Sequence, residues 1–222
     1  MGKIIVLAAI KGGSGKSTLA RNISLWLSEH RGKTAAVDLD PQGSLDKFCS
    51  DRAERTGKLE VGIEFIPRPE GLKAKLENIS KENEWVVCDV GGRDTIPLRV
   101  TLAQASAVLV PVRPGQEDID SFADLMAAVD EIRASMNENL KVYVIMNQCP
   151  IDLHDQLAPS VVKGLREEYG DEIIVLDTRL RHRKAWSKSR FAAQAIWEHS
   201  WSDQANQEFQ RMVSELTKKE VF

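Results

Sequence analysis

The chain has 222 residues, of which 30 are Lys or Arg and 33 are Asp or Glu, and its formal net charge is −3. This length suffices for one α/β domain with a substantial core, and the charge excludes a uniformly basic protein while permitting a local basic patch. No apolar run approaches the ~20 residues of a membrane-spanning helix. The 3 cysteines form no CxxC pair, and no signal peptide is evident, so we expect a soluble, cytoplasmic protein.

Apolar, β-branched segments alternate with segments of helical periodicity along the whole chain. Strands are expected at residues 3–10, 34–39, 60–66, 85–89, 107–112, 141–147 and 172–177. Helices are expected at residues 17–30, 43–57, 71–81, 95–104, 117–136, 155–169, 184–196 and 202–219. Short strands that are apolar on both faces and alternate with helices are typical of a doubly wound, mostly parallel sheet. We therefore expect a single α/β domain over residues 1–222, with about seven strands flanked by helices.

The first expected strand leads directly into a glycine-rich segment, Lys-Gly-Gly-Ser-Gly-Lys-Ser-Thr at residues 11–18. Its glycines allow a tight turn that points backbone N–H groups at phosphate oxygens. In such a loop Lys16 neutralises the β- and γ-phosphates, the Ser17 hydroxyl is a ligand of Mg²⁺, and the start of the next helix adds positive charge. The sequence thus predicts a nucleoside triphosphate site. The residues expected to bind the nucleotide here are Gly12, Gly13, Ser14, Gly15, Lys16, Ser17 and Thr18.

This loop departs from the common phosphate-loop pattern at its start. The pattern has glycine where the chain has Ile10, and a second lysine, Lys11, follows. The variant resembles the deviant phosphate loop of the ParA/MinD family of P-loop ATPases. That resemblance implies a P-loop NTPase fold, ATP and Mg²⁺ as cofactors, and a homodimer in the ATP-bound state. It also implies that Lys11 of each subunit reaches the phosphates bound by the other and stabilises the transferring phosphoryl group.

A second motif, Val-Asp-Leu-Asp-Pro-Gln-Gly at residues 37–43, ends the second expected strand. Carboxylates at positions i and i+2 of a strand point the same way, so Asp38 and Asp40 should both face the phosphates. The motif resembles the Asp-x-Asp-Pro-Gln motif of the ParA branch. The resemblance implies that Asp40 orients or activates the attacking water and that Asp38 supports the water shell of Mg²⁺. A simple acidic turn ended by proline is the alternative.

The third motif is an apolar strand that ends in Asp89 and continues into Gly91 and Gly92. It matches the Walker B pattern, in which the carboxylate holds Mg²⁺ through water. The two glycines leave room for a loop near the γ-phosphate that responds to hydrolysis. Together the motifs predict Lys11, Lys16 and Asp40 as catalytic residues. The predicted metal-site residues are Ser17, Asp38 and Asp89.

Two further matches follow the fifth and sixth expected strands. The segment at residues 111–118 resembles the family's Pro-x-x-Pro loop with a downstream aspartate, Asp118, which implies a place near the nucleotide and the dimer interface. Its alternative is a proline-punctuated turn capped by that aspartate. Asn147 stands where several relatives hydrogen-bond adenine, although many strands end in asparagine for turn reasons alone.

A basic stretch follows the seventh strand, and no acidic residue occurs between Thr178 and Trp197. Concentrated positive charge is what non-specific contact with DNA phosphates requires, and ParA relatives bind nucleoid DNA through this region. A solvated helix face or contacts with the partner subunit would give the same pattern. The nearby Trp186, Trp197 and Trp201, with Phe191, are expected to form a core beneath a helix hairpin, although aromatic rings beside basic residues can also stack on bases. The predicted DNA-binding residues are Arg179, Arg181, Arg183, Lys184, Lys188 and Arg190.

Four motifs in this order make the chain most similar to small ParF-like partition proteins. The resemblance implies a weak, partner-stimulated ATPase that associates with the nucleoid, binds DNA non-specifically and segregates plasmid or chromosomal DNA with a ParB/ParG-like centromere-binding adaptor. Ala193 replaces a glycine common in that group, so we expect a helical turn there.

Two other functions remain open. The first is an orphan ParA-like ATPase that positions a protein cargo or a conjugation complex. The second is a MinD-like ATPase at a membrane. The last expected helix argues against the second, because its polar face mixes acids with bases instead of being largely basic. We expect that helix to pack on the domain through Ala205, Phe209, Met212, Val213 and Leu216.

Overall fold

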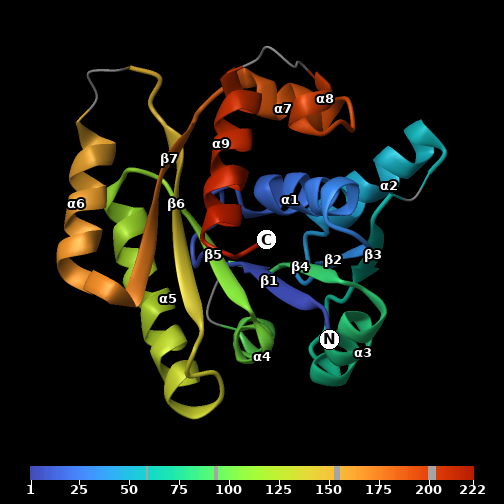
Figure 1. The fold of residues 1–222 in the computed structure, drawn as a ribbon, viewed down its shortest axis with the longest axis horizontal. Coiled ribbons are helices and arrows are strands. Elements are labelled where there is room, and N and C mark those ends of the chain that lie inside the picture. Colours follow the sequence, from blue (N-terminus) through green and yellow to red (C-terminus); the bar gives the residue numbers. More distant parts are fainter. Residues whose placement is uncertain (59, 93–94, 153–155, 200–203) are drawn as a thin grey trace.

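The computed structural model describes residues 1–58, 60–92, 95–152, 156–199 and 204–222. Within them, seven strands form one sheet in the order β3-β2-β4-β1-β5-β6-β7, and every strand pair is parallel (Figure 1). The strands are β1 (Lys3–Leu7), β2 (Thr34–Asp38), β3 (Gly62–Phe65), β4 (Trp85–Asp89), β5 (Ala107–Val112), β6 (Lys141–Cys149) and β7 (Ile173–Arg181). The expected doubly wound α/β fold is confirmed.

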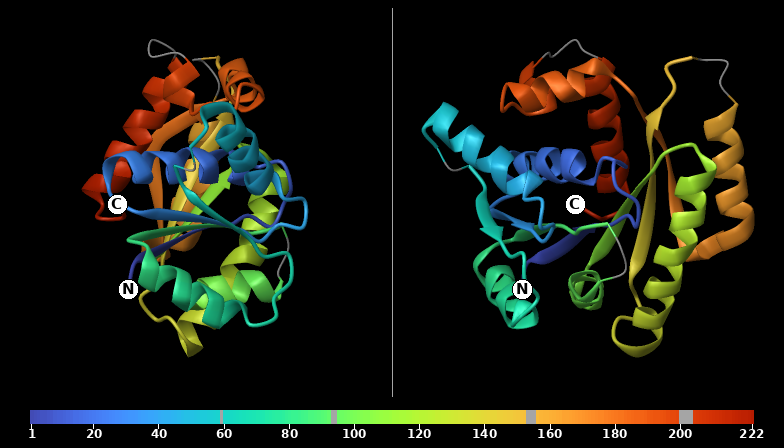
Figure 2. Two further views of the ribbon diagram at one scale, coloured as in Figure 1. Left: turned by 90° about the vertical axis from the view of Figure 1, so that its right-hand side faces the viewer. Right: turned by 180° about the vertical axis from the view of Figure 1, so that it is seen from behind.

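Helices cover both faces of the sheet (Figures 1 and 2). Over one face lie α1 (Lys16–His30), α2 (Ser44–Thr56), α7 (Lys184–Phe191), α8 (Ile196–His199) and α9 (Gln204–Lys218). Over the other lie α3 (Leu72–Glu82), α4 (Ile96–Gln104), α5 (Gln116–Ser135) and α6 (Leu157–Tyr169), followed by the short 3₁₀ helix η1 (Gly170–Glu172). Each face has its own apolar core. In β1, Ile4 and Val6 face one core and Ile5 and Leu7 the other, which is why this strand is apolar throughout.

The sheet order places the candidate motifs together. β1 lies between β4 and β5, so the glycine-rich loop that leaves β1 emerges near the middle of the sheet. In the strand register, Asp89 at the end of β4 is level with Leu7 of β1 and with Asp38 of β2. The three motifs therefore meet at the carboxyl ends of neighbouring parallel strands, where ligands bind in folds of this class.

Most element boundaries fall within a few residues of those expected, and β4 and β5 match residue for residue. Two elements differ more. β7 continues to Arg181, so part of the basic stretch lies on a strand. The helix expected at 184–196 ends at Phe191, and the helical turn expected at Ala193 is wrong, because this residue has a left-handed φ of 48°. A Gln194 N–H to Ser189 carbonyl bond of 2.8 Å closes the helix as glycine commonly does.

Candidate nucleotide-binding site

The glycine-rich loop needs its glycines for conformation and for close contact. Gly13 and Gly15 have φ angles of 80° and 96°, a region that L-residues with a side chain rarely adopt. A Cβ on Gly15 would also lie 2.3 Å from Nδ2 of Asn147. α1 begins at the next residue, Lys16, and its unpaired first N–H groups face the loop. The chain thus builds an anion-binding loop where the sequence predicts it.

A cavity of about 820 Å³ opens beside this loop. Its walls come from the predicted motifs, from the two prolines after β3 (Pro67 and Pro69) and from the start of α4, with Thr95 and Pro97. Gly92 allows the walls to meet, because a Cβ on it would lie 2.7 Å from the carbonyl oxygen of Ile10. The lining residues that the motifs supply include Gly12, Gly13, Gly15, Lys16, Ser17, Thr18, Asp40, Gly91 and Gly92.

Asp89 is the least satisfied charged group in the described part of this site. Its side chain is fully buried, and neither carboxylate oxygen has a hydrogen-bond partner among the described residues; the buried Ser14 hydroxyl also lacks one. Burial raises the pKa of Asp89 to about 7, partly offset by the Ser17 hydroxyl and, more weakly, by Lys16. An unpaired buried carboxylate is costly unless a cation compensates it.

This arrangement fits Mg²⁺. In the described residues no group of three or more His, Cys, Asp or Glu side chains forms a cage of metal ligands. Mg²⁺ does not need one, because it commonly keeps several waters and takes one or two protein ligands together with substrate phosphates. Ser17 and Asp89 provide that kind of donor set beside the loop.

Asp38 has a structural role that the sequence did not reveal. Its buried carboxylate accepts N–H bonds from Asp40 (3.1 Å), Leu45 (2.8 Å) and Asp46 (2.9 Å), so it caps the start of α2. Its pKa is nevertheless raised, because desolvation outweighs these bonds. Asp40 instead lines the cavity and is half-buried, with Oδ1 accepting the N–H of Gln42 at 2.9 Å. Of the two motif carboxylates, Asp40 faces the open space.

Lys11 lies at the rim of the site, where its ammonium group forms an ion pair with Glu117 at the start of α5. The next residue, Asp118, is buried and holds the guanidinium of Arg113 through bonds of 2.9 to 3.1 Å. Nη1 of this arginine lies 3.8 Å from the position of a Cβ on Gly13. The Pro-x-x-Pro segment therefore packs against the loop, and the partner of Lys11, Glu117, was missed although it adjoins the predicted Asp118.

The end of β6 holds the loop from the other side. Asn147 donates from Nδ2 to the carbonyl oxygen of Ser14, and Gln148 donates from Nε2 to that of Gly13, both at 2.6 Å. Gln148 was not predicted, although it directly follows Asn147, and its φ of 52° is unusual. It also lines the first cavity and a second one of about 370 Å³. The second cavity is bounded by Gly15, Thr18, Leu19, Arg21, Asn147, Gln148, Arg181, His182, Arg183, Lys184, Trp186, Ser187 and Arg190.

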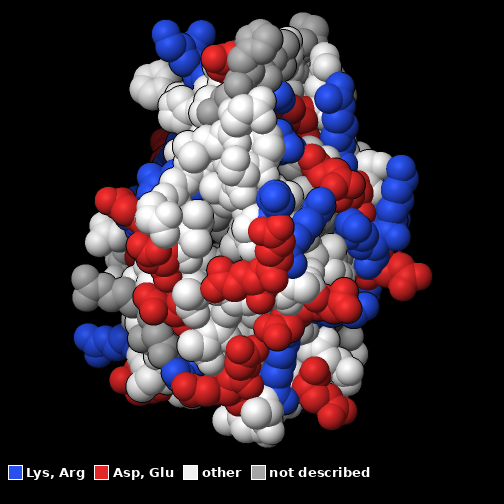
Figure 3. All heavy atoms as spheres, turned by 90° about the vertical axis from the view of Figure 1, so that its left-hand side faces the viewer, with Lys and Arg blue, Asp and Glu red and all other residues white. Residues whose placement is uncertain are grey.

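The basic stretch is divided by its ion pairs. The buried Glu208 of α9 pairs with Arg181 (3.3 Å) and Arg183 (2.8 Å), and Asp51 of α2 pairs with Arg190 (2.8 Å). Lys184 and Lys188 are exposed. Figure 3, which views the molecule from the side of α6 and β7, shows acidic groups beside basic ones rather than a uniformly basic face.

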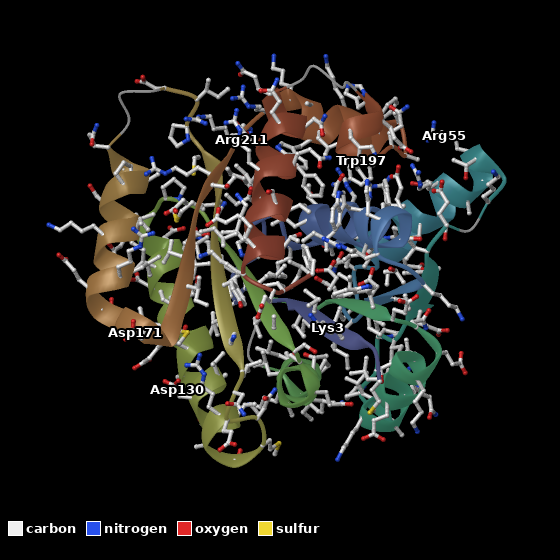
Figure 4. The ribbon with its side chains drawn as sticks, in the orientation of Figure 1. Lys3, Arg55, Asp130, Asp171, Trp197 and Arg211 are labelled. Atoms are coloured by element: carbon white, nitrogen blue, oxygen red, sulfur yellow. The ribbon has the colours of Figure 1, made fainter. Side chains whose placement is uncertain are left out.

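The aromatic residues near this stretch differ in how far they are buried. Trp197 lies among the C-terminal helices (Figure 4). It is buried, as expected, and stacks on Phe209 with ring centroids 5.5 Å apart. Trp186 is half-buried and meets the same ring edge-on at 6.3 Å. Trp201 lies outside the described residues. The core position expected for Phe191 is wrong, because this side chain at the end of α7 is 95 % exposed.

The model of the CobQ/CobB/MinD/ParA nucleotide-binding domain family matches residues 5–190, so the chain belongs to this family. It is 27 % identical to the chromosome-partitioning ATPase Soj of Thermus thermophilus, over 96 % of this chain and 94 % of the relative. It is 26 % identical to the maintenance of carboxysome distribution protein A of Halothiobacillus neapolitanus, over 65 % of each.

Solved structures share the fold. Apo McdA from Cyanothece superposes with a TM-score of 0.80 and 16 % identity, over 97 % of this chain and 100 % of that chain. A putative plasmid partition protein from Borrelia burgdorferi bound to AMPPNP gives a TM-score of 0.68 and 18 % identity, over 96 % and 100 %. At these identities the similarity establishes the fold alone.

Proposed function

We propose that the protein is a Mg²⁺-dependent ATPase that dimerises when it binds ATP. The observation that carries this proposal is the buried, unpaired carboxylate of Asp89 beside a complete phosphate loop. Structures with a similar fold include an ATP complex of McdA and a cobyrinic acid a,c-diamide synthase with an ATP analogue and magnesium. We therefore assign ATP and Mg²⁺ to this chain as its cofactors.

The phosphates would lie in the first cavity and the base in the second. Backbone N–H groups of the loop and Lys16 would bind the β- and γ-phosphates, and Ser17 and Asp89 would hold Mg²⁺, which would neutralise phosphate charge. Asp40, which lines this cavity, would orient the attacking water. Asn147 lines the second cavity, and since its Nδ2 is bonded to Ser14, its Oδ1 is the atom left to accept the amino group of adenine.

The rim of the first cavity supports a face-to-face homodimer. Proline side chains line it, and Phe65 and Ile96, which lie in the same segments, are 42 % and 64 % exposed. Apolar groups around a charged site are typical of a surface that a second subunit covers. In the dimer Lys11 would leave Glu117 and reach the phosphates bound by the partner, where it stabilises the charge of the transition state. The loops and helices that carry these residues connect strands of one continuous sheet, which supports a single domain over residues 1–222.

The ATP-bound dimer would bind DNA non-specifically and release it after hydrolysis, with turnover stimulated by a ParB/ParG-like adaptor. The exposed lysines after β7 and the similarity to Soj support this function, which would place the protein in the cytoplasm on the nucleoid. A second candidate is the positioning of a protein cargo, which is favoured by the similarity to McdA and to the carboxysome distribution protein.

A membrane function is less well supported. The apolar side chains of α9 (Ala205, Phe209, Met212, Val213 and Leu216) are all buried against the sheet, as expected from the sequence. They are therefore unavailable for insertion into a bilayer. Among the helices that the structure describes, none has the length and apolar character to cross a membrane.

A gel-shift assay with ATP, ADP or no nucleotide, across a salt series, tests the proposal. Tight DNA binding is expected with ATP but not with ADP or without nucleotide. A plot of the logarithm of the binding constant against the logarithm of the salt concentration should have a slope of about −4 to −5, for ~4–6 neutralised phosphates. Lys16→Ala should remove nucleotide binding or turnover and, with it, the ATP-dependent shift. DNA binding that is indifferent to the nucleotide would refute the switch. Nucleotide-dependent dimerisation without any DNA binding would favour the protein-cargo candidate.

A further inference from the structure

The outward side of α7 combines positive charge with an exposed aromatic ring. Lys184, Lys188 and Phe191 stand at positions i, i+4 and i+7, so they lie along one face of this helix. Both lysines are exposed, and neither forms an ion pair in the described part of the chain, whereas Arg183 and Arg190 on the same segment are paired. Among the described residues, Phe191 is the most exposed large apolar side chain.

A hollow of about 420 Å³ adjoins this face. Both lysines line it, together with Arg183, Ile151 and His199. Arg183 is engaged by Glu208, a single carboxylate that it shares with Arg181, whereas the two lysines that line the hollow form no ion pair among the described residues. α7 lies over the sheet face opposite to α3–α6, and its turn after Phe191 is fixed by Arg52 and Arg55, which both donate to the carbonyl oxygen of Ala193 at 3.2 Å.

We propose that this face of α7 is the surface that contacts duplex DNA, with Phe191 as its apolar anchor. Lys184 and Lys188 hold backbone phosphates, and Phe191 enters the minor groove against sugars and base edges. The inference rests on the DNA binding in the proposed function and names the residues that perform it. It moves the contact from Arg181, Arg183 and Arg190, which are held by acidic partners, to two lysines and one phenylalanine.

The chemistry of this face favours DNA over other occupants. Ammonium groups on flexible stems bind phosphate as point charges without a fixed geometry, which suits a ligand whose sequence is not read. An apolar wedge beside such charges is a recurring device of proteins that bind the minor groove. The backbone around the wedge is held by the Arg52 and Arg55 bonds, so little further ordering is required when it binds.

Fluorescence anisotropy of a labelled mixed-sequence duplex, with the full chain, ATP and Mg²⁺, tests the inference. Phe191→Ala is expected to weaken binding about tenfold, by analogy with aromatic contacts to bases, and to leave the salt slope unchanged. Phe191→Trp should retain most of the affinity. Lys184→Gln with Lys188→Gln should instead reduce the magnitude of the slope by about 0.9 for each phosphate that the variant no longer neutralises.

The control variants lie elsewhere on the surface. Met136→Ala removes another exposed apolar side chain, and Lys73→Gln with Lys75→Gln removes two exposed charges from α3, on the opposite face of the sheet. Both controls should bind DNA as the wild type does. Because Phe191 is so exposed, its variants should also keep the wild-type melting temperature and ATPase rate.

Several outcomes would overturn the inference. The first is wild-type affinity in Phe191→Ala, and the second is a loss in Phe191→Trp as large as that in the alanine variant. The third is an effect of Phe191→Ala on binding to anionic vesicles or polyglutamate but not to the duplex, which would assign the face to a membrane or an acidic protein. A stronger effect on single-stranded than on duplex DNA would replace groove insertion by base stacking and overturn the duplex assignment. If the wild type binds no DNA with any nucleotide, the DNA-binding part of the proposed function is wrong, and the inference about α7 is wrong with it.

Discussion

The phosphate loop and the basic stretch after β7 both stand out as short runs of sequence, yet they behave differently in three dimensions. The loop works through its own backbone: its glycines set its turn, and its N–H groups and Lys16 lie within a few residues of each other. The basic stretch depends on residues far away. Glu208 is 27 residues from Arg181, and Asp51 is 139 residues from Arg190.

The difference shows when a sequence motif can be trusted. A phosphate loop needs a local geometry, which its sequence encodes, whereas a run of charges acquires its role from whatever packs against it. Glu208 is buried and pairs its one negative charge with two arginines, so these side chains join β7 and the start of α7 to α9. The free charge of the stretch is therefore smaller than the six cations suggest.

Variants of Lys11 test the proposed role of the phosphate loop in dimerisation and ATP hydrolysis, and the largest effect is expected here. Lys11→Ala is expected to bind ATP as a monomer but to lose the dimer and nearly all ATPase activity, because in the proposed dimer the ammonium group of Lys11 would act in the partner's site. Glu117→Gln is the matched control, since it removes the partner of Lys11 and keeps the lysine. It should retain activity. Analytical ultracentrifugation with ATP measures dimerisation, and a phosphate-release assay measures ATPase activity. Wild-type turnover in Lys11→Ala would refute the proposed dimer.

Variants of Glu208 test whether the arginines of the basic stretch have a structural role. Glu208→Gln should lower the free energy of unfolding by about 2–3 kcal/mol, because it removes the buried charge that two arginines share. Lys184→Gln, one residue beyond Arg183, should change it by less than about 0.5 kcal/mol, as is usual for an exposed side chain. Urea unfolding of the two variants provides the comparison. Equal stability would mean that these arginines are not structural.

Much of this architecture could be predicted from the sequence. β4 and β5 were placed correctly because every residue in them is buried and, apart from Asp89 at the end of β4, apolar. The end of β7 was missed because Asp177, Thr178 and Arg179 are polar, although the strand still pairs with β6 after two register shifts. A polar strand at the edge of the sheet leaves no apolar pattern to detect.

Parts of the site could not be predicted from the sequence. The spacing of Asp38 and Asp40 predicted two carboxylates on one side, but not that the chain turns back and uses one of them to cap α2. The exposure of Phe191 depends on the turn at Ala193, and that turn is held by Arg52 and Arg55, some 140 residues earlier. Such contacts between distant segments leave no local signal.

The buried carboxylate of Asp89 gives the loop region a pH dependence. With the pKa of this group raised to about 7, the folded protein holds the proton more tightly than the unfolded chain, where an aspartate has a pKa of about 3.9. The free energy of unfolding should therefore fall as the pH rises from about 4 to about 7 and then level off. Asp89→Asn should remove this contribution. Urea unfolding of the wild type and of Asp89→Asn at pH 5 and pH 8 measures this contribution. If the free energy of unfolding changes equally with pH in both proteins, the prediction is wrong.

The smallest effect is expected at the boundary between the two regions, where Asp51 of α2 pairs with Arg190 of α7. Both side chains are partly exposed, so Asp51→Asn should cost less than about 1 kcal/mol of stability. The same change frees Arg190 from its acidic partner. If that arginine then finds a DNA phosphate, affinity should rise slightly and the salt slope should steepen by about 0.9 for each additional phosphate neutralised. If neither changes, Arg190 also stays fixed by its contact with the ring of Phe48, and the three ion-paired arginines stabilise the fold while the lysines of α7 carry the interface.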